Sequence, residues 1–326
     1  MTTFTLGDRL FDEYEVLMQA TNSAGPRGAV LVTGASSGLG RVAAIHLAAK
    51  GFQVFAGVRS DVVGKELANE SERLVPIHLD VTSESAIAAA GERIAQTCGA
   101  DGLLGLVNNA GVCYSAPLEC LSSEDLRYQL EVNVIGAVAV TRTFLPLLRV
   151  GTAAAGPVGR IVNVGSGVGR VASPFLGAYA ASQFAKEGLS DSLRRELAAQ
   201  SVSVSVIEPG AILTPIWDKV SDTAERVLEQ APPDIAALYR TRFTAFVAMN
   251  EGLAKSSRTK PEQFAKVVEH ALTARNPKTR YRVGLDSLAS TLAARLLPDR
   301  ILDLVLAKSA GSNSAVVQTI SAADTR

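Results

Sequence analysis

The turn that decides the fold reads Thr33-Gly34-Ala35-Ser36-Ser37-Gly38-Leu39-Gly40 and lies between an apolar run of strand length and a segment of helical period. Three glycines at such a turn permit positive φ angles and bring the backbone close to a bound phosphate. The start of the following helix adds unpaired N–H groups and a positive dipole. We therefore predict a site for the pyrophosphate of a dinucleotide. The spacing GxxxGxG, without a GK[ST] ending, excludes a P-loop for nucleoside triphosphates.

On either side of this turn, short apolar runs alternate with longer segments of helical period. The runs are rich in Val, Ile and Leu without polar alternation, which is typical of strands covered on both faces. This alternation predicts an α/β fold: a single doubly wound Rossmann-type domain with a parallel sheet of about seven strands. The expected strands are Ala29–Thr33, Gln53–Val58, Leu74–Leu79, Leu103–Val107, Arg160–Val164, Val202–Glu208 and Tyr281–Val283, and the expected helices are Leu39–Lys50, Ser83–Cys98, Ser123–Arg149, Ala178–Gln200 and Pro261–Arg275.

Changes in composition along the chain set the expected boundaries. Residues 1–28 precede the first strand and end in a turn-rich linker, so they are expected to be an N-terminal extension. Residues 29–285 are the expected Rossmann domain, in which about 212–256 form a small helical lid over the carboxyl edge of the sheet. Residues 286–326 are expected to form an amphipathic helix, broken at Pro298, and a tail. Because this helix has no basic face, packing on the domain or on another subunit is favoured over docking on a membrane.

The composition excludes several classes of protein. The 32 Lys and Arg residues balance 32 Asp and Glu residues, which removes the electrostatic case for nucleic acid as a partner. No segment reaches about 18 uninterrupted apolar residues, so no membrane span is expected, and residues 1–18 lack the apolar block of a signal peptide. The three cysteines have no CxxC spacing and the three histidines are far apart, so neither disulfides nor a metal site are expected. These features predict a cytoplasmic globular protein.

Further motifs follow the turn in a fixed order. They are Leu79-Asp80-Val81, Asn108-Asn109-Ala110-Gly111, Asn133 in the long helix, Ser166 followed by Tyr179, and Pro209-Gly210 with Thr214. With these motifs the chain resembles the short-chain dehydrogenase/reductase family over about residues 28 to 285. On residues 114–148, Phe175 and residues 208–217, the likeness is nearest to the branch that contains retinol and hydroxysteroid dehydrogenases. The resemblance implies a Rossmann fold, a nicotinamide dinucleotide cofactor and the interconversion of an alcohol and a carbonyl group.

The resemblance also implies the residues that hold the cofactor. Asp80 would lie near the adenine, Asn108 would support the ribose side, and Thr214 would contact the nicotinamide carboxamide. The full expected set is Gly34, Ser36, Ser37, Gly38, Leu39, Gly40, Arg59, Asp80, Val81, Asn108, Ala110, Gly111, Pro209, Gly210 and Thr214.

The end of the second strand decides between the two nicotinamide cofactors. A carboxylate there would bind the adenosine ribose 2′-hydroxyl and repel a 2′-phosphate, but Val58 stands in its place. Arg59 offers a fixed charge and planar donors suited to a phosphate, and Ser37 can add a hydroxyl. NADP(H) is therefore favoured over NAD(H). The alternative for Arg59 is a solvated residue that contacts Asp61 or nothing.

The resemblance implies Tyr179 as the proton donor or acceptor, Ser166 as the group that orients the substrate oxygen, and Asn133 as a supporting amide. The family's lysine, four residues after the tyrosine, is Gln183 here. An amide brings no charge to stabilise tyrosinate, and an opposite charge shifts a pKa by about 1–3 units. Two replacements stay open: Lys186, which lies on the same helical face, and the positive charge of the oxidised cofactor.

The sequence supports two hypotheses about function. The leading one is an NADP(H)-dependent oxidoreductase for an alcohol or carbonyl group in a largely apolar small molecule, weakened by Gln183. The alternative is an inactive dinucleotide-binding protein with a regulatory or structural role. The resemblance implies a homodimer or homotetramer through the helices at 123–149 and 178–200. Apolar groups expected on the substrate side are Leu176, Ile212, Ile216 and Trp217.

Overall fold

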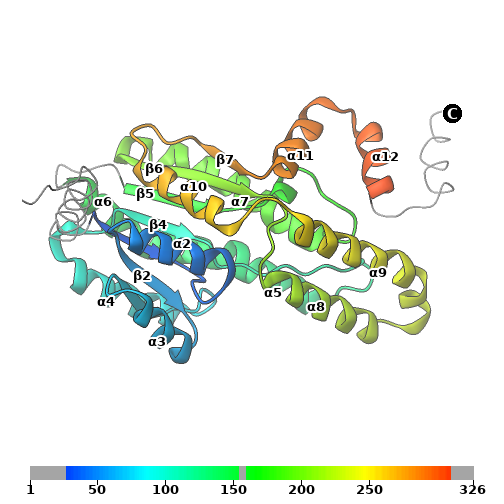
Figure 1. Ribbon diagram of the computed structural model, residues 1–326, viewed down its shortest axis with the longest axis horizontal. Coiled ribbons are helices and arrows are strands. Elements are labelled where there is room, and N and C mark those ends of the chain that lie inside the picture. Colours follow the sequence, from blue (N-terminus) through cyan, green and yellow to red (C-terminus); the bar gives the residue numbers. More distant parts are fainter. Residues whose placement is uncertain (1–26, 154–158, 310–326) are drawn as a thin grey trace, which may run out of the picture.

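In the computed structural model, which describes residues 27–153 and 159–309, seven parallel strands form one sheet in the order β3-β2-β1-β4-β5-β6-β7 (Figure 1). The order reverses between β1 and β4, so their carboxyl ends open a crevice of the kind that binds ligands in doubly wound sheets. The predicted α/β fold is confirmed. The strands are β1 Ala29–Val32, β2 Gln53–Val58, β3 Leu74–His78, β4 Gly105–Asn108, β5 Gly159–Val164, β6 Val202–Pro209 and β7 Arg280–Val283.

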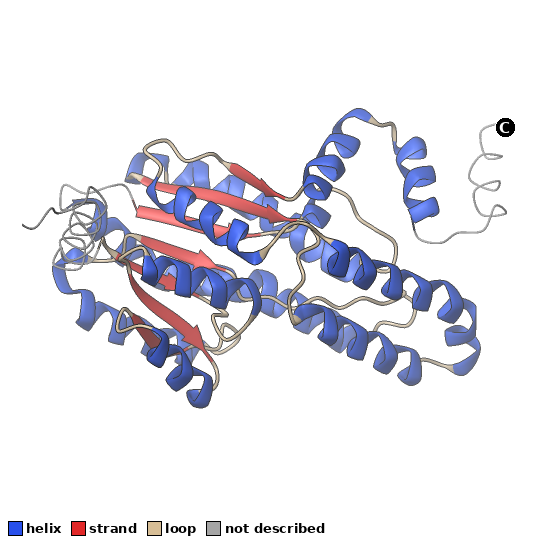
Figure 2. Cartoon of the chain, in the orientation of Figure 1, coloured by secondary structure: helices blue, strands red, loops and turns tan. Residues whose placement is uncertain are grey.

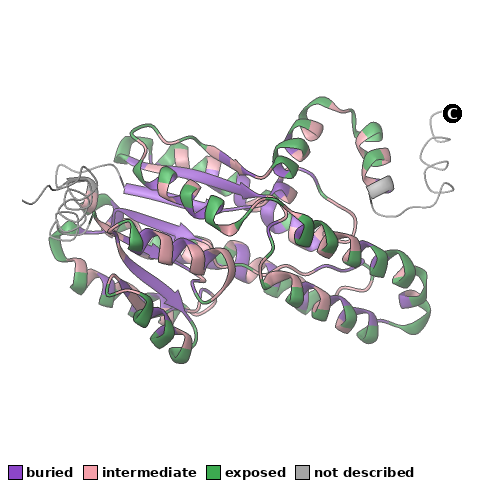
Figure 3. Cartoon of the chain, in the orientation of Figure 1, coloured by how far each residue is buried: buried purple, intermediate pink, exposed green. Residues whose placement is uncertain are grey.

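Helices cover both faces of the sheet, which is why its strands are apolar on both sides (Figures 2 and 3). One core holds Val32, Leu47 and Phe264 under α2 and α10, and the other holds Leu31 and Phe144 under α4 and α6. The covering helices are α2 Gly38–Ala49, α3 Asp61–Glu70, α4 Glu84–Cys98, α5 Ser123–Leu130, α6 Gly136–Ala153, α7 Gly177–Glu196 and α10 Pro261–Thr273. The short 3₁₀ turns are η1 Gly99–Asp101, η3 Gly167–Gly169 and η4 Ala198–Gln200.

The long helix expected at 123–149 is interrupted. A π-helical turn, η2 (Glu131–Ile135), separates α5 from α6 and holds Asn133. Within the described residues, Ser123–Gly151 is the single helical stretch whose length and apolar composition would suffice to cross a bilayer. Its side chains Val140, Phe144 and Leu148 are fully buried against the sheet, whereas Ile135 and Val138 are exposed.

A helical hairpin extends beyond the carboxyl edge of the sheet (Figure 1). It consists of α8 (Ile216–Gln230) and α9 (Pro233–Ser256), and its own small core joins Leu228 and Phe243 to Phe175 from the domain. These helices occupy the region where the lid is expected.

The described residues end in α11 (Leu285–Leu296) and α12 (Asp299–Ser309), which are separated at Pro298. The sequence analysis missed α3 and placed several strand ends one or two residues away. The expected extension at 1–28 lies almost wholly outside the described residues, as does the tail beyond residue 309.

Candidate active site

A cleft of about 690 Å³ opens at the carboxyl edge of the sheet. It is bounded by the ends of β1 to β6, the start of α7, the lid helices and the start of α11. Nearly all the residues expected in the site line it. They are Gly34, Ser36, Ser37, Gly38, Leu39, Arg59, Asp80, Val81, Ala110, Gly111, Asn133, Ser166, Tyr179, Gln183, Pro209, Gly210 and Thr214.

The glycine turn is shaped by close backbone packing. Gly34 and Gly38 have φ angles of 65° and 55°, which side chains strain to adopt. A Cβ on Gly40 would collide with the carbonyl of Gly34 and the amide of Asn109. Gly40 therefore serves the turn by packing behind it and does not line the cleft.

Thr33 fastens this turn to the end of β4. Its Oγ1 accepts hydrogen bonds from the backbone N–H groups of Asn109 and Ala110 at 3.0 and 2.9 Å. Asn109 Nδ2 returns a bond to the carbonyl of Thr33 at 3.0 Å. The turn after β1 and the end of β4 thus form one floor, with glycines where a pyrophosphate can approach.

The expected role of Asn108 needs correction. Its Nδ2 donates to Thr141 Oγ1 at 2.8 Å and to Asn163 Oδ1 at 2.9 Å, and the side chain is buried beneath the sheet edge away from the cleft. Successive side chains at the end of a strand point to opposite sides, so its neighbour Asn109 reaches the cleft instead. Asn109 was missed because the motif alone does not tell which of two adjacent asparagines points to which side.

The far end of the cleft has donors without protein acceptors. Ser37 begins α2, yet within the described part of the chain its hydroxyl makes no capping hydrogen bond to that helix. Among the same residues, Arg59 forms no hydrogen bond or close ion pair, with Asp61 or otherwise. Partial burial raises the pKa of Asp80, but hydrogen bonds from Thr82 and the charge of Arg59 outweigh it and lower that pKa below its ordinary value.

Tyr179 and Ser166 lie together on the inner wall. Burial raises the pKa of the Tyr179 hydroxyl well above its ordinary value, the thiol of Cys113 adds to this, and a hydrogen bond with Ser166 opposes it. Ser166 also accepts a hydrogen bond from the N–H of Val168 at 3.2 Å, which fixes its rotamer. The pair that the resemblance implies is therefore brought into contact.

Asn133 is held by the protein itself. Its Oδ1 accepts from the N–H of Val112 at 2.8 Å, and its Nδ2 donates to the carbonyl of Val112 at 2.9 Å and to Ser182 Oγ at 3.1 Å. Gln129, one turn earlier, likewise donates to the Val112 carbonyl at 2.8 Å. These two amides attach the wall at Val112 to α7. Gln129 was missed by the sequence analysis, although a glutamine on an inward helical face is a usable signal.

Position 183 carries an unsatisfied acceptor. The side chain of Gln183 is 3% exposed and lines the cleft, and its Oε1 has no hydrogen-bond partner among residues 27–153 and 159–309. A buried acceptor left unpaired costs about 1–3 kcal/mol. A ligand with a hydroxyl donor at this place would remove that cost.

Lys186 also reaches the cleft. Its side chain is 4% exposed, and its Nζ donates to the carbonyl of Val164, at the end of β5, at 3.0 Å. Burial lowers the pKa of this ammonium to about 8.

The lid side of the cleft is mixed but largely apolar. The indole N–H of Trp217 donates to the carbonyl of Ile212 at 2.9 Å, so its ring is fixed in place. Asp286 of α11 accepts a hydrogen bond from the N–H of Ala211, an addition from the C-terminal segment that the sequence analysis did not foresee. The lid-side lining comprises Leu176, Ile212, Ile216, Trp217, Val220, Phe246, Val247 and Leu253, with Lys219, Asp222, Thr223 and Asn250.

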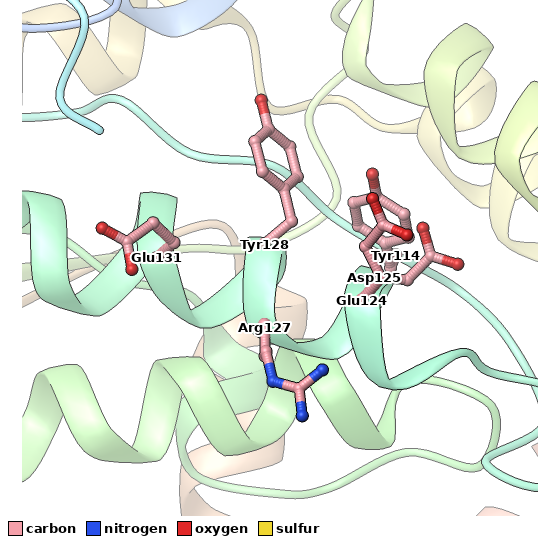
Figure 4. A pocket seen from close by; sticks show the side chains of 6 residues that line it. All are labelled: Tyr114, Glu124, Asp125, Arg127, Tyr128 and Glu131. Atoms are coloured by element: carbon pink, nitrogen blue, oxygen red, sulfur yellow. The ribbon is translucent and has the colours of Figure 1, made fainter. Parts of the chain in front are cut away.

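A second, shallower pocket of about 470 Å³ lies at the start of α5 (Figure 4). Its lining is Tyr114, Glu124, Asp125, Arg127, Tyr128 and Glu131, and the two tyrosines also line the main cleft. This pocket is an outer vestibule of the same site. Within the described residues, no group of three or more His, Cys, Asp or Glu side chains is placed to hold a metal ion.

Comparison with known proteins gives a consistent family. The family model described as short chain dehydrogenase matches residues 28–225. A 3-amino-tetrahydro-pyrrolizinone reductase from Xenorhabdus hominickii is 42% identical over 80% of this chain and 88% of its own. A 17-beta-hydroxysteroid dehydrogenase type 6 from Bos taurus is 38% identical over 86% of this chain and 88% of its own. A short chain dehydrogenase from Burkholderia cenocepacia, solved in complex with NADP, is 26% identical, with a TM-score of 0.65 over 86% and 98% of the two chains.

Proposed function

The chain belongs to the short-chain dehydrogenase family and is a dehydrogenase/reductase that acts on CH–OH groups, and on that premise we propose that it uses NADP(H) to interconvert an alcohol and a ketone or aldehyde in a largely apolar small molecule. The observation that carries the proposal is the meeting of Tyr179, Ser166 and the glycine turn in one cleft. The relatives are named as dehydrogenases and reductases, and none of these comparisons supports the alternative of an inactive dinucleotide-binding protein.

The residues present fit a nicotinamide dinucleotide. The unpaired Oε1 of Gln183 is a buried acceptor on the wall of the cleft, which a ribose hydroxyl would satisfy. Gly34 lets the turn pack tightly on Ala110, and at Gly38 a Cβ would lie no closer than 3.5 Å to Thr214, so the floor stays open to a pyrophosphate there. When bound, the nicotinamide supplies or accepts the hydride. Ser37 and Arg59 support the preference for a 2′-phosphate, because both offer donors without protein partners and Val58 carries no carboxylate to repel it.

The chain's own groups account for orientation and proton transfer. Ser166 holds the substrate oxygen beside the Tyr179 hydroxyl, and Tyr179 gives its proton to that oxygen during reduction or takes it during oxidation. Asn133 and Gln129 fix the wall that faces them. The raised pKa of Tyr179 keeps it protonated at neutral pH, which suits it as an acid.

The substrate side supports a mainly apolar molecule with a few polar groups. Trp217, Ile212 and Ile216 offer apolar area, while Asn250 and Asp222 can hydrogen-bond a polar substituent. The relatives' names point to retinoid, steroid and pyrrolizinone carbonyls as first probes. A homodimer or homotetramer and a cytoplasmic location are part of the proposal. Exposed Ile135, Val138 and Phe184 on η2, α6 and α7 support the former.

The test is NADPH consumption with a panel of retinal, steroid ketones, cyclic amide ketones, simple aldehydes and quinones, run beside Tyr179→Phe. We expect turnover with at least one apolar carbonyl and its loss in the variant, which should still bind NADPH. Tight binding of NADPH without turnover on any member of the panel would contradict the proposal.

A further inference from the structure

The turn that carries Ser166 packs closely on its neighbours through glycines. Ser166 precedes η3 and Arg170 follows it, and Gly167 and Gly169 lie between them. A Cβ on Gly169 would lie 3.2 Å from the carbonyl oxygen of Gln183 on α7, and Gly167 lies equally near the start of α11. The glycines allow this close packing, but they supply no side chain that could fix the turn in place.

Arg170 extends from the end of this turn into the interior of the domain. Its Nη2 donates to Glu187 Oε2 on α7 at 2.6 Å, and its Nε donates to Glu208 Oε1 on β6 at 2.9 Å. Both glutamates are buried, and Glu208 completely so. The Nε and Nη2 groups are parallel donors on one edge of the guanidinium plane. A single side chain therefore joins the Ser166 turn to a helix and to a strand at once.

The two glutamates are also held by arginines of β7. Arg280 Nε donates to Glu187 Oε2 at 2.9 Å, and Arg282 Nε lies 3.4 Å from Glu208 Oε2. Burial raises the pKa of Glu187, and the charge of Arg170 opposes that rise. Because β7 binds both carboxylates independently of the turn, they offer Arg170 a fixed place of attachment.

This attachment connects the two groups that would act on one substrate oxygen. Tyr179 lies on α7, eight residues before Glu187, and Ser166 lies four residues before Arg170. The contact of Arg170 with Glu187 therefore relates the position of the serine turn to the helix of the tyrosine. A misplacement of about 1 Å in such a pair can cost about a hundredfold in rate. A role limited to balancing the buried negative charge would need only a cation, which a lysine also supplies.

We propose that Arg170 is a positioning residue that sets Ser166 against Tyr179 through its two-point contact with Glu187 and Glu208. The inference rests on the proposed function. Arg170 lies outside the lining of the cleft, so it touches neither substrate nor cofactor and acts only through the placement of the Ser166 hydroxyl. Both contacts are required, because a turn held at one point can still pivot about it.

The experiment compares Arg170→Lys with the unchanged protein. Lysine keeps a positive charge beside the buried glutamates, so the fold should persist, but its single nitrogen lacks the parallel donors of a guanidinium edge. Arg194→Lys is the matched control, because Arg194 pairs with Asp191 on its own helix at 3.2 Å. Kinetics are measured with the best carbonyl of the panel, in the unchanged background and in Ser166→Ala.

We expect Arg170→Lys to lower kcat about tenfold or more, with KM for NADPH nearly unchanged. In the Ser166→Ala background the same substitution should lower kcat by no more than about twofold, since it acts through the missing hydroxyl. Arg194→Lys should change kcat in neither background. An unchanged kcat in Arg170→Lys would overturn the inference. So would an equal fall in both backgrounds, which would mean that Arg170 acts on α7 as a whole.

A second readout needs no turnover. The N–H of Val168 donates to Ser166 Oγ at 3.2 Å, so amide hydrogen exchange at Val168 in the NADP-loaded protein reports the order of the turn. Exchange should be faster in Arg170→Lys and unchanged in Arg194→Lys. Glu208→Met removes one of the two contacts from the opposite side and should give the same result, which keeps the test open if Arg170→Lys does not fold.

The exchange measurement decides the matter where Ser166→Ala has no measurable rate. Unchanged exchange at Val168 in Arg170→Lys and in Glu208→Met would overturn the inference. Faster exchange in these variants, with no turnover of any carbonyl by the unchanged protein, would support the positioning of Ser166 by Arg170 while contradicting the proposed function.

Discussion

Arg226 on α8 and Asp125 on α5 form a two-pronged ion pair, with Nη2 2.9 Å from Oδ1 and Nη1 3.4 Å from Oδ2. The guanidinium also lies 5.8 Å from the ring centroid of Tyr114. The pair therefore joins the lid to the body of the domain beside the vestibule of the cleft. Because Arg226 is 39% exposed, solvent screens the attraction, which should contribute at most about 1 kcal/mol.

The lid should loosen when this ion pair is removed. In Arg226→Met we expect faster amide hydrogen exchange across Ile216–Gln230 and a severalfold higher KM for the carbonyl substrate, with little change in melting temperature. Arg240→Met, an exposed arginine on α9, should change neither quantity. Equal exchange in both variants would show that the lid is held by its apolar core instead.

Cofactor preference should depend on Arg59. We expect NADPH to bind at least about tenfold more tightly than NADH, a difference of about 1.4 kcal/mol. Arg59→Ala should remove most of that difference while leaving NADH binding nearly unchanged, and Val58→Asp should reverse it by repelling the 2′-phosphate. Isothermal titration with both cofactors measures this. Equal affinities in the unchanged protein would rule out the assignment.

Gly38 should tolerate no side chain in the cofactor-bound state. Its φ of 55° strains a β-branched residue, and a Cβ would point at Thr214 across the mouth of the site. Gly38→Val should therefore abolish NADPH binding while circular dichroism still reports a folded protein. The same change at Gly188, where a Cβ meets nothing within 4 Å, is the control. Normal binding by Gly38→Val would mean that the phosphate floor has been placed wrongly.

Burial of the Lys186 ammonium should lower the free energy of unfolding of the protein. Burial lowers its pKa from 10.5 to about 8, so the unfolded chain binds more protons between these values and stability rises with pH across that window. The loss in free energy of unfolding reaches its maximum below pH 8, where it is at most about 3 kcal/mol. Lys186→Met should raise the free energy of unfolding at pH 7, with an advantage that shrinks toward pH 10.5. Urea unfolding at several pH values tests it; a destabilised variant would contradict it.

The exposed apolar side chains on α6 and α7 should form the subunit contact. Val138 on α6 and Phe184 on α7 are each 47% exposed. Phe184→Glu should convert the proposed oligomer to a monomer in light scattering, while Leu238→Glu, on the lid, should not. An unchanged mass for Phe184→Glu would place the contact elsewhere.

Periodicity and turn chemistry sufficed for the sheet, because buried parallel strands read as uninterrupted apolar runs. They failed for α3. Only Gly64 and Leu67 are buried in this helix, so too few apolar residues recur at helical spacing to predict it. The π turn was invisible, since its extra residue is set by tertiary contacts of Asn133 and Gln129 with Val112. Asp286 was missed for a similar reason: β7 carries it to the cleft from more than 70 residues away along the chain.

The π turn at Glu131–Ile135 contains one residue more than a regular α-helical turn, and the assembly of the site depends on that extra residue. Removing one residue there would leave a regular α-helix with its backbone hydrogen bonds complete. Gln129, before the turn, would rotate by about 100° relative to α6, which would take its amide away from Val112. A scan of single-residue deletions should therefore find a position here where the protein stays folded and soluble but its catalytic wall is no longer assembled.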